Sequence, residues 1–154
     1  MQSAQTGIVA RITHLVARGD HLIGMFPAAL TLLVMRIALA VPFWRSGVLK
    51  WESFPFEISP IAVLLFEDEF GFPFPVVSAH LAALAEVILP VLLVLGLFTR
   101  YVALGLAVMT VVIQFTVPDG WPTHILWFGL ALDLMSHGGG NLALDRLWMP
   151  RREG

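Results

Sequence analysis

The chain has 154 residues, of which 58% are hydrophobic and 13% are charged. Soluble domains carry about a quarter charged residues, so this composition excludes an ordinary globular protein, and it also excludes a disordered chain. The net charge of −2 argues against nucleic-acid binding, and the absence of cysteine excludes disulfides, thiolate metal sites and cysteine nucleophiles.

Apolar stretches long enough, or nearly long enough, to cross a bilayer occur four times, since crossing takes about 20 residues. They cover about residues 24–48, 76–98, 101–117 and 121–136, the last of them short. Thr99-Arg100 and Pro118-Asp119-Gly120 form tight joints, and the glycines at 138–140 end the fourth stretch. We therefore expect an all-α integral membrane protein, a four-helix bundle spanning residues 24–148.

The connection from Leu49 to Pro75 is the long one, and it contains a helix signal. Ser59-Pro60 is typical of a helix start, which predicts a short helix over Ile61–Phe70 in the outer loop. Glu67, Asp68 and Glu69 point in three directions on such a helix, so we interpret them as a solvated acidic edge.

Residues 1–23 are expected to form an amphipathic cytoplasmic segment, with Arg11 and Arg18 on its polar face. Residues 149–154 form a basic cytoplasmic tail. Arg100 adds a positive charge at the joint between the second and third stretches, whereas the long loop from Leu49 to Pro75 is acidic. The positive-inside rule therefore predicts a multi-pass protein of the bacterial inner membrane with both termini in the cytoplasm.

Three stretches, in this order and spacing, resemble the DoxX family of small bacterial membrane proteins. They are MRIALAVPFWRSGVLKW, AEVILPVLLVLGLFTRYVALGLAVM and WPTHILWFGLALDLMSHGGGNLALDRL. The resemblance implies a four-helix membrane fold. It also implies a redox association, because one branch of the family is similar to a subunit of thiosulfate:quinone oxidoreductase and others are associated with oxidative-stress or detoxification complexes.

Arg36 and Glu86 are ionisable residues near the middle of the first and second spans, where such groups are costly and often functional. By helical rise both lie near the midplane, and small residues flank each of them. We predict that they form an ion pair in the bundle interior. The pair is either a static packing contact or a catalytic pair, in which Glu86 exchanges a proton with a quinone-like ligand.

Other polar and aromatic groups are candidates for cofactor binding. Gln114 shares a face with Thr110, which favours an interhelical hydrogen bond over a ligand role. His80 and His124 begin the second and fourth spans, so they could meet at the outer mouth and bond a quinone carbonyl; their spacing favours interfacial histidines over a metal site. Trp44, together with Phe43, Phe115 and Trp127, could flank a ring.

The sequence is compatible with three classes of function. The first hypothesis is a membrane subunit or accessory protein of a redox system that binds a quinone. The second is a non-catalytic membrane anchor for a soluble oxidoreductase, and the third is a small transporter. The sequence leaves open whether the chain is an enzyme and whether it forms a homo-oligomer.

Overall fold

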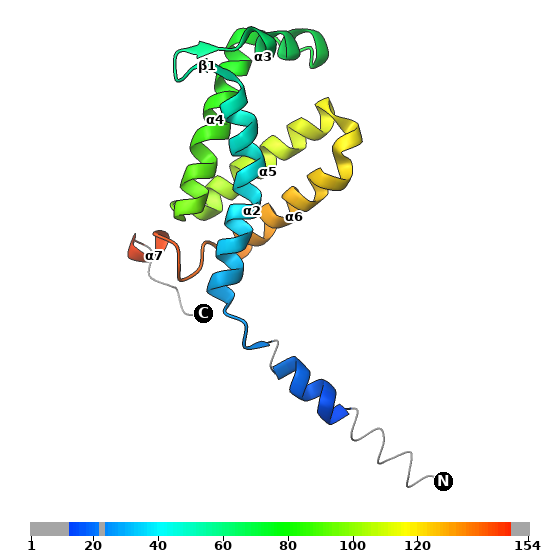
Figure 1. Cartoon of the computed structure of the whole chain (residues 1–154), viewed down its shortest axis with the longest axis vertical. Coiled ribbons are helices and arrows are strands. Elements are labelled where there is room, and N and C mark those ends of the chain that lie inside the picture. The colour runs from blue at the N-terminus through cyan, green and yellow to red at the C-terminus, as the bar shows by residue number, and fades with distance from the viewer. Residues whose placement is uncertain (1–12, 22–23, 149–154) are drawn as a thin grey trace, which may run out of the picture.

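Residues 13–21 and 24–148 are described by the computed structural model, and most of them are helical. Figure 1 shows that long helices dominate the fold. These helices are α2 (Ala28–Leu49), α4 (Pro75–Leu95), α5 (Thr99–Thr116) and α6 (Trp121–His137). Within the described part of the chain, α2, α4 and α5 are long and apolar enough to cross a membrane.

Helix α6 is shorter, with 17 residues. At 1.5 Å per residue it extends about 25 Å, slightly less than a hydrocarbon core of about 30 Å. It follows the 3₁₀ turn η2 (Pro118–Gly120) and ends where Gly138 begins the glycine run, as the sequence predicts. The structure thus supports a mostly helical protein with three helices of membrane-spanning length and a shorter fourth helix.

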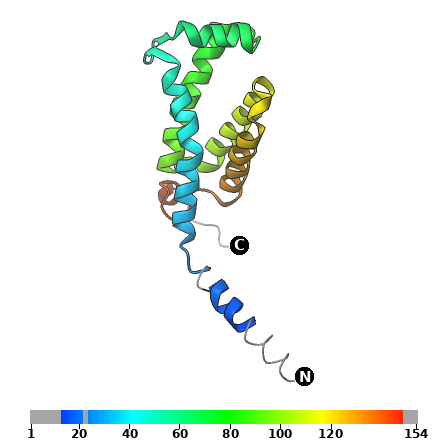
Figure 2. The ribbon, with the colours of Figure 1, turned by 45° about the vertical axis from the view of Figure 1, so that its right-hand side comes forward.

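The long helices pack as two pairs, α2 with α4 and α5 with α6. Figures 1 and 2 show that the pairs meet near the turn between α4 and α5 and diverge toward the end where α3 lies. This arrangement leaves space between the pairs on the α3 side.

Small and medium-sized apolar residues form the core where the pairs meet, which lets the helix backbones approach closely. The core residues are Leu39, Ala40, Phe43, Leu93, Val102, Ala103, Leu106, Ala107, Ala131 and Leu134. Large apolar residues such as Leu81, Val108 and Leu126 are more than half exposed on the outer faces. Such faces suit contact with lipid rather than water.

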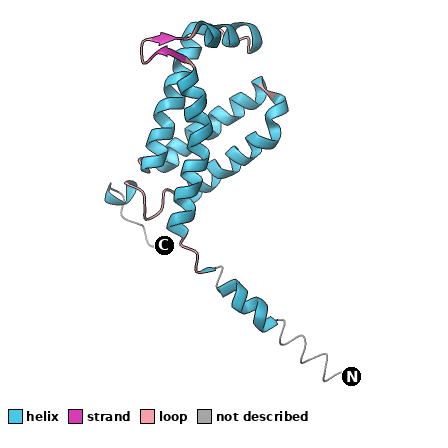
Figure 3. Cartoon of the chain, in the orientation of Figure 1, coloured by secondary structure: helices cyan, strands magenta, loops and turns pink. Residues whose placement is uncertain are grey.

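The loop between α2 and α4 contains a short β-hairpin, which the sequence analysis did not predict. Strand β1 (Trp51–Ser53) pairs antiparallel with β2 (Glu57–Ile58), and Trp51 lies opposite Ile58. Ile58 is buried and Trp51 packs against the same small core, so burial of these two side chains favours the extended backbone. Figure 3 shows the hairpin at one end of the helices.

The predicted loop helix is confirmed, as α3 (Pro60–Leu64) followed by a π-helical turn, η1 (Leu65–Glu69). Glu67, Asp68 and Glu69 are exposed, as expected for a solvated edge.

At the N-terminal end, residues 13–21 are helical and nearly all exposed. The remainder of the predicted 1–23 segment, apart from these residues, and the whole 149–154 tail lie outside the described residues. The C-terminal described element is the short helix α7 (Asp145–Trp148).

Candidate functional site

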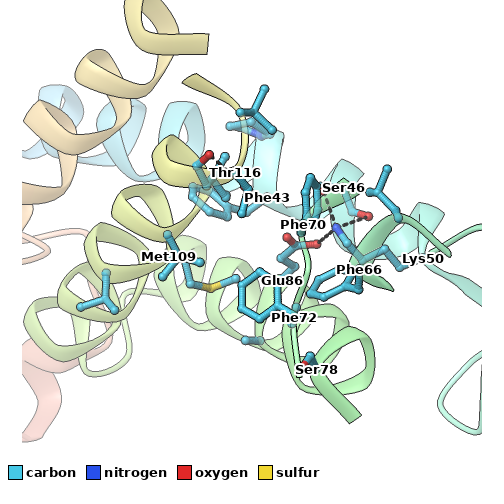
Figure 4. A pocket seen from close by; sticks show the side chains of 18 of the residues that line it. Phe43, Ser46, Lys50, Phe66, Phe70, Phe72, Ser78, Glu86, Met109 and Thr116 are labelled. Atoms are coloured by element: carbon cyan, nitrogen blue, oxygen red, sulfur yellow. Dashed lines mark hydrogen bonds and ion pairs between the residues drawn. The ribbon is translucent and has the colours of Figure 1, made fainter. Parts of the chain in front are cut away.

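A cavity of about 480 Å³ lies between the α2–α4 pair and helix α5, and residues of η1 and the following loop line one side of it. Figure 4 shows the side chains that line it. Its wall is mostly apolar, and its polar lining residues include Glu86, Lys50 and Ser46. The full lining comprises Pro42, Phe43, Ser46, Lys50, Leu65, Phe66, Phe70, Phe72, Ser78, Ala82, Ala85, Glu86, Val108, Met109, Val112, Ile113, Thr116, Val117 and Trp127.

Glu86 and Lys50 form an ion pair in the cavity wall. The Lys50 Nζ lies 2.5 Å from Glu86 Oε2 and donates a second hydrogen bond to Ser46 Oγ at 2.7 Å. The two side chains are only 12% (Lys50) and 5% (Glu86) exposed. Because a charge removed from water is costly unless it is paired, each group stabilises the charged form of the other here.

The sequence brings these groups together through close packing of α2 on α4. Ser46 and Lys50 lie one turn apart at the C-terminal end of α2, and Gly47 lies between them. A Cβ at Gly47 would lie 2.8 Å from the Glu86 Cβ, so only glycine permits this approach. On α4, Ala79 and Ala83 are fully buried on the same face as Glu86.

Aromatic rings from two parts of the chain contribute to the lining. Phe43 of α2 packs on Trp127 of α6, with ring centroids 5.4 Å apart. The connection between α2 and α4, residues 50–74, forms a layer over one end of the helices, which we call the loop layer. In it Phe66, Phe70 and Phe72 contact one another, with ring centroids 5.4 to 6.5 Å apart. The cavity is therefore an aromatic chamber with one buried ion pair in its wall.

The predicted pairing of Arg36 with Glu86 was wrong. Arg36 is fully buried, but its guanidinium donates to the Val94 and Leu142 carbonyls, each at 3.0 Å, and to the Leu93 carbonyl at 3.5 Å. Leu93 lies seven residues after Glu86 on α4, which is about 10 Å along the helix. Arg36 thus lies nearer the α4–α5 turn than Glu86 does, and the α2 residue that packs against Glu86 is Gly47, 11 positions after Arg36.

The segment after α6 folds back onto the α4–α5 turn beside Arg36. The Asp145 carboxylate accepts hydrogen bonds from the backbone N–H groups of Phe98 (2.6 Å) and Thr99 (2.8 Å), at the start of α5. The Asp145 N–H donates to the Gly96 carbonyl at 2.8 Å. Arg36 and Asp145 therefore hold together the end of the fold where α4 meets α5.

Gln114 and His124 lie together, but outside the cavity lining. His124 Nδ1 lies 2.7 Å from Gln114 Oε1, and Gln114 Nε2 donates to the Pro118 carbonyl at 3.1 Å. The expected interhelical hydrogen bond of Gln114 is confirmed, since it joins α5 to α6. The ring of His124 also packs on Trp127, which does line the cavity.

His80 lies elsewhere, and the structure does not bring it to His124. Its Nδ1 contacts the Val76 carbonyl at 2.8 Å, and its ring meets the edge of Trp51 beside the β-hairpin. Trp44 is 42% exposed and is not part of the cavity lining. Of the residues singled out as candidates from the sequence, Glu86, Phe43 and Trp127 line the cavity.

Lys50 and Ser46 are functional candidates that the sequence analysis did not single out. A signal existed: Phe43, Ser46 and Lys50 follow a three-and-four spacing on one helical face. The three phenylalanines of the loop carry no such signal, because their positions depend on how the loop folds over the helices.

Helices of membrane-spanning length with exposed apolar outer faces define a small helical membrane protein. The family model for DoxX matches residues 31–119, which is more than half of the sequence. The chain therefore belongs to the DoxX family. The match covers the first two stretches quoted for the resemblance and all of the cavity lining except Trp127.

A relative of similar length is an uncharacterized protein of Haemophilus influenzae (strain Rd). It is 30% identical over 135 residues, covering 78% of this chain and 84% of that protein. No solved structure matches the chain.

Proposed function

We propose that this protein is a membrane subunit or accessory protein of a redox system, and that its cavity binds a quinone-like ligand. One observation carries the proposal: a buried carboxylate–ammonium pair lies in the wall of an aromatic chamber inside a membrane protein. Ionisable groups inside membrane helices commonly mark ligand or proton sites.

A quinone head group fits the chemistry of this lining. The volume of about 480 Å³ lies within the range of about 300–1,000 Å³ that is typical of small-molecule sites. Phe43 and Trp127 on one side and Phe66 on another offer faces for a flat ring. Lys50, Glu86 and Ser46 converge at one place in the lining, where they would hold one oxygen of the ring.

A bound quinone would supply two-electron, two-proton carrier chemistry at this place. Lys50 would donate a hydrogen bond from Nζ to a ring oxygen, and Glu86 would accept or return a proton at its carboxylate. The chain has no cysteine to carry electrons, so the electrons would come from a partner such as a soluble redox enzyme.

The test compares Glu86→Gln with Glu67→Gln after mild detergent extraction. Gln keeps the shape of Glu86 but removes the exchangeable proton and weakens the hold on Lys50. We expect wild type and Glu67→Gln, which changes an exposed carboxylate outside the cavity, to co-purify with a quinone detectable by mass spectrometry. Glu86→Gln leaves the buried Lys50 without its carboxylate and should lower stability, but variant protein that is folded, as judged by circular dichroism, should lose the ligand. A wild-type protein that neither carries nor binds any quinone would contradict the proposal.

A second proposal is a non-catalytic anchor for a soluble oxidoreductase. It is supported by the exposed acidic side chains of the loop layer, which offer a docking surface for a basic partner. They are Glu52, Glu57, Glu67, Asp68 and Glu69. Co-purification of a soluble redox enzyme that is lost when these residues are neutralised would favour this function. No observation in the described residues favours the third hypothesis, a transporter.

The proposed location is the bacterial inner membrane, with α6 as the fourth crossing and both termini in the cytoplasm. Arg100 and Arg146, both exposed, lie at the end of the fold where α4 meets α5, and the acidic loop layer lies at the other end. This separation of charge supports the orientation.

A further inference from the structure

We propose that the cavity opens sideways into the bilayer between α4 and α5, and that the quinone-like ligand binds with an apolar chain lying in this opening. The inference rests on the proposed function and adds two points to it. The ligand enters from the bilayer through the side opening, and it is a neutral ring that carries an isoprenoid-like chain rather than a free water-soluble ring.

The opening is defined by residues that line the cavity and are also exposed on the outer surface. On α5 these are Val108, which is 56% exposed, and Val112, which is 43% exposed. On α4 the facing positions are the small residues Ala82 and Ala85, both half-buried and both part of the lining. An apolar surface reached from both the cavity and the exterior connects the cavity with the lipid.

Contacts close the other sides of the chamber. Between α2 and α4, the close approach of Gly47 to Glu86 leaves no space for a side chain. Between α5 and α6, the bond from His124 to Gln114 joins the helices, and between α2 and α6 the ring of Phe43 packs on Trp127. Toward the loop layer, the aromatic cluster around Phe66 covers the cavity. The side between α4 and α5 is thus the one along which the ligand would pass.

The inner limit of the opening lies where α4 and α5 come together. A Cβ at Gly105 of α5 would lie 3.2 Å from Leu89 Cδ1 of α4, so the helices touch there. From this contact outward the two helices diverge, as Figures 1 and 2 show. Glu86 lies one turn beyond Leu89, so the ion pair is at the deep end of the opening.

The charge of the site selects the head group. Lys50 and Glu86 neutralise each other, so the site has no net charge to attract an anionic phospholipid head. A neutral ring with carbonyl or hydroxyl oxygens can bond both groups without leaving either unpaired. The apolar side opening then suits a hydrocarbon chain that continues into the bilayer.

The experiment narrows the opening and compares two probes in lipid nanodiscs: a benzoquinone with a decyl chain and the same ring without it. Val112→Phe fills the opening from α5. Val111→Phe is the matched control, because Val111 has the same side chain, is 42% exposed and lies outside the lining. Ala85→Phe fills the opening from α4 as a second variant. Binding is read after equilibration as quenching of the Trp127 fluorescence, and Trp127→Phe identifies that signal.

We expect both probes to bind wild type. For each probe, Val111→Phe should bind as tightly as wild type does. Val112→Phe should weaken binding of the decyl probe about tenfold, which corresponds to about 1.4 kcal/mol, and leave the chainless ring nearly unchanged. Thermal unfolding confirms that each variant is folded. If both filling variants bind the decyl probe as wild type does, the side opening is wrong and the quinone site stands. If wild type binds neither probe, the proposed function itself fails.

Discussion

Arg36 and Lys50 carry the same charge on the same helix but are used in different ways. The planar guanidinium of Arg36 spreads its donors over carbonyls from two segments, the end of α4 and the loop at Leu142. The compact ammonium of Lys50 instead pairs with Glu86 in the cavity. A fork of donors suits several fixed acceptors, and a point charge suits one carboxylate, so the two residues are not interchangeable.

Replacement of Arg36 should therefore harm stability rather than ligand binding. Arg36→Met leaves buried carbonyls without donors, and we expect the free energy of unfolding to fall by about 2–4 kcal/mol. Arg36→Lys should recover only part of this loss. Denaturation in detergent, followed by circular dichroism, measures the effect.

Arg45→Met is the control, because Arg45 is exposed on the same helix and should change stability little. Folded Arg36→Met protein should still bind the ligand of the cavity. Loss of ligand binding in folded protein would return Arg36 to the functional site and contradict the structural role.

The turn between α4 and α5 depends on a cap that comes from a distant segment. Gly96 and Phe98 adopt positive φ values of 70° and 51°, and no side chain within α5 caps its first N–H groups. Asp145, 46 residues beyond Thr99, supplies the acceptor. The Gly96 position must be glycine, because a Cβ there would also collide with Arg36.

Asp145→Ala should destabilise the protein by about 0.5–2 kcal/mol, the usual cost of losing an N-terminal cap. Amide hydrogen exchange should also become faster at Phe98 and Thr99, because these N–H groups lose their acceptor. Asp133→Ala serves as the control, since Asp133 pairs only with the exposed His137 one turn away. Equal effects of the two substitutions would show that the Asp145 cap adds no stability.

The two helix pairs together form a wedge. They pack against each other at the closed end, where α4 meets α5, and spread apart at the open end, where the aromatic cluster around Phe66 covers the cavity between them. The closed end is held by Arg36, Asp145 and the contact between Gly105 and Leu89. The open end contains the cavity with its ion pair. This division separates stability from ligand binding along the axis of the fold.

Whether α6 crosses the membrane can be tested by labelling single introduced cysteines. The chain has no cysteine of its own, so the labelling has no background from this protein. Single variants Glu67→Cys, Asp119→Cys and Asn141→Cys place a thiol at exposed positions of three connections. With a membrane-impermeant maleimide on intact cells, we expect Glu67→Cys and Asp119→Cys to be labelled and Asn141→Cys to be protected. Permeabilised cells provide the labelling control. Equal labelling of Asp119→Cys and Asn141→Cys would show that α6 does not cross.

Local signals were sufficient for much of the fold but for little of the site. The joint at Thr99 and the glycines after His137 were placed correctly, because turn residues act over a few positions. Glu86 was identified because a carboxylate in an apolar helix is exceptional wherever its partner lies. Its partner was misassigned, because the depth of each residue was estimated from the ends of its own span, whereas the pairing depends on how far α2 is shifted along α4. Lys50 lies 14 residues after Arg36, about four helical turns.

Composition and apolar periodicity therefore determined the class of this protein, its order of helices and the presence of a charged group inside α4, because each depends only on residues near one another in the chain. The tertiary structure decided which charges pair, which aromatic rings share a cavity and which segment caps α5. These contacts join residues 36 to 106 positions apart, and their geometry follows from how far one helix slides along another. Small residues such as Gly47 set that register through packing, which no local pattern specifies.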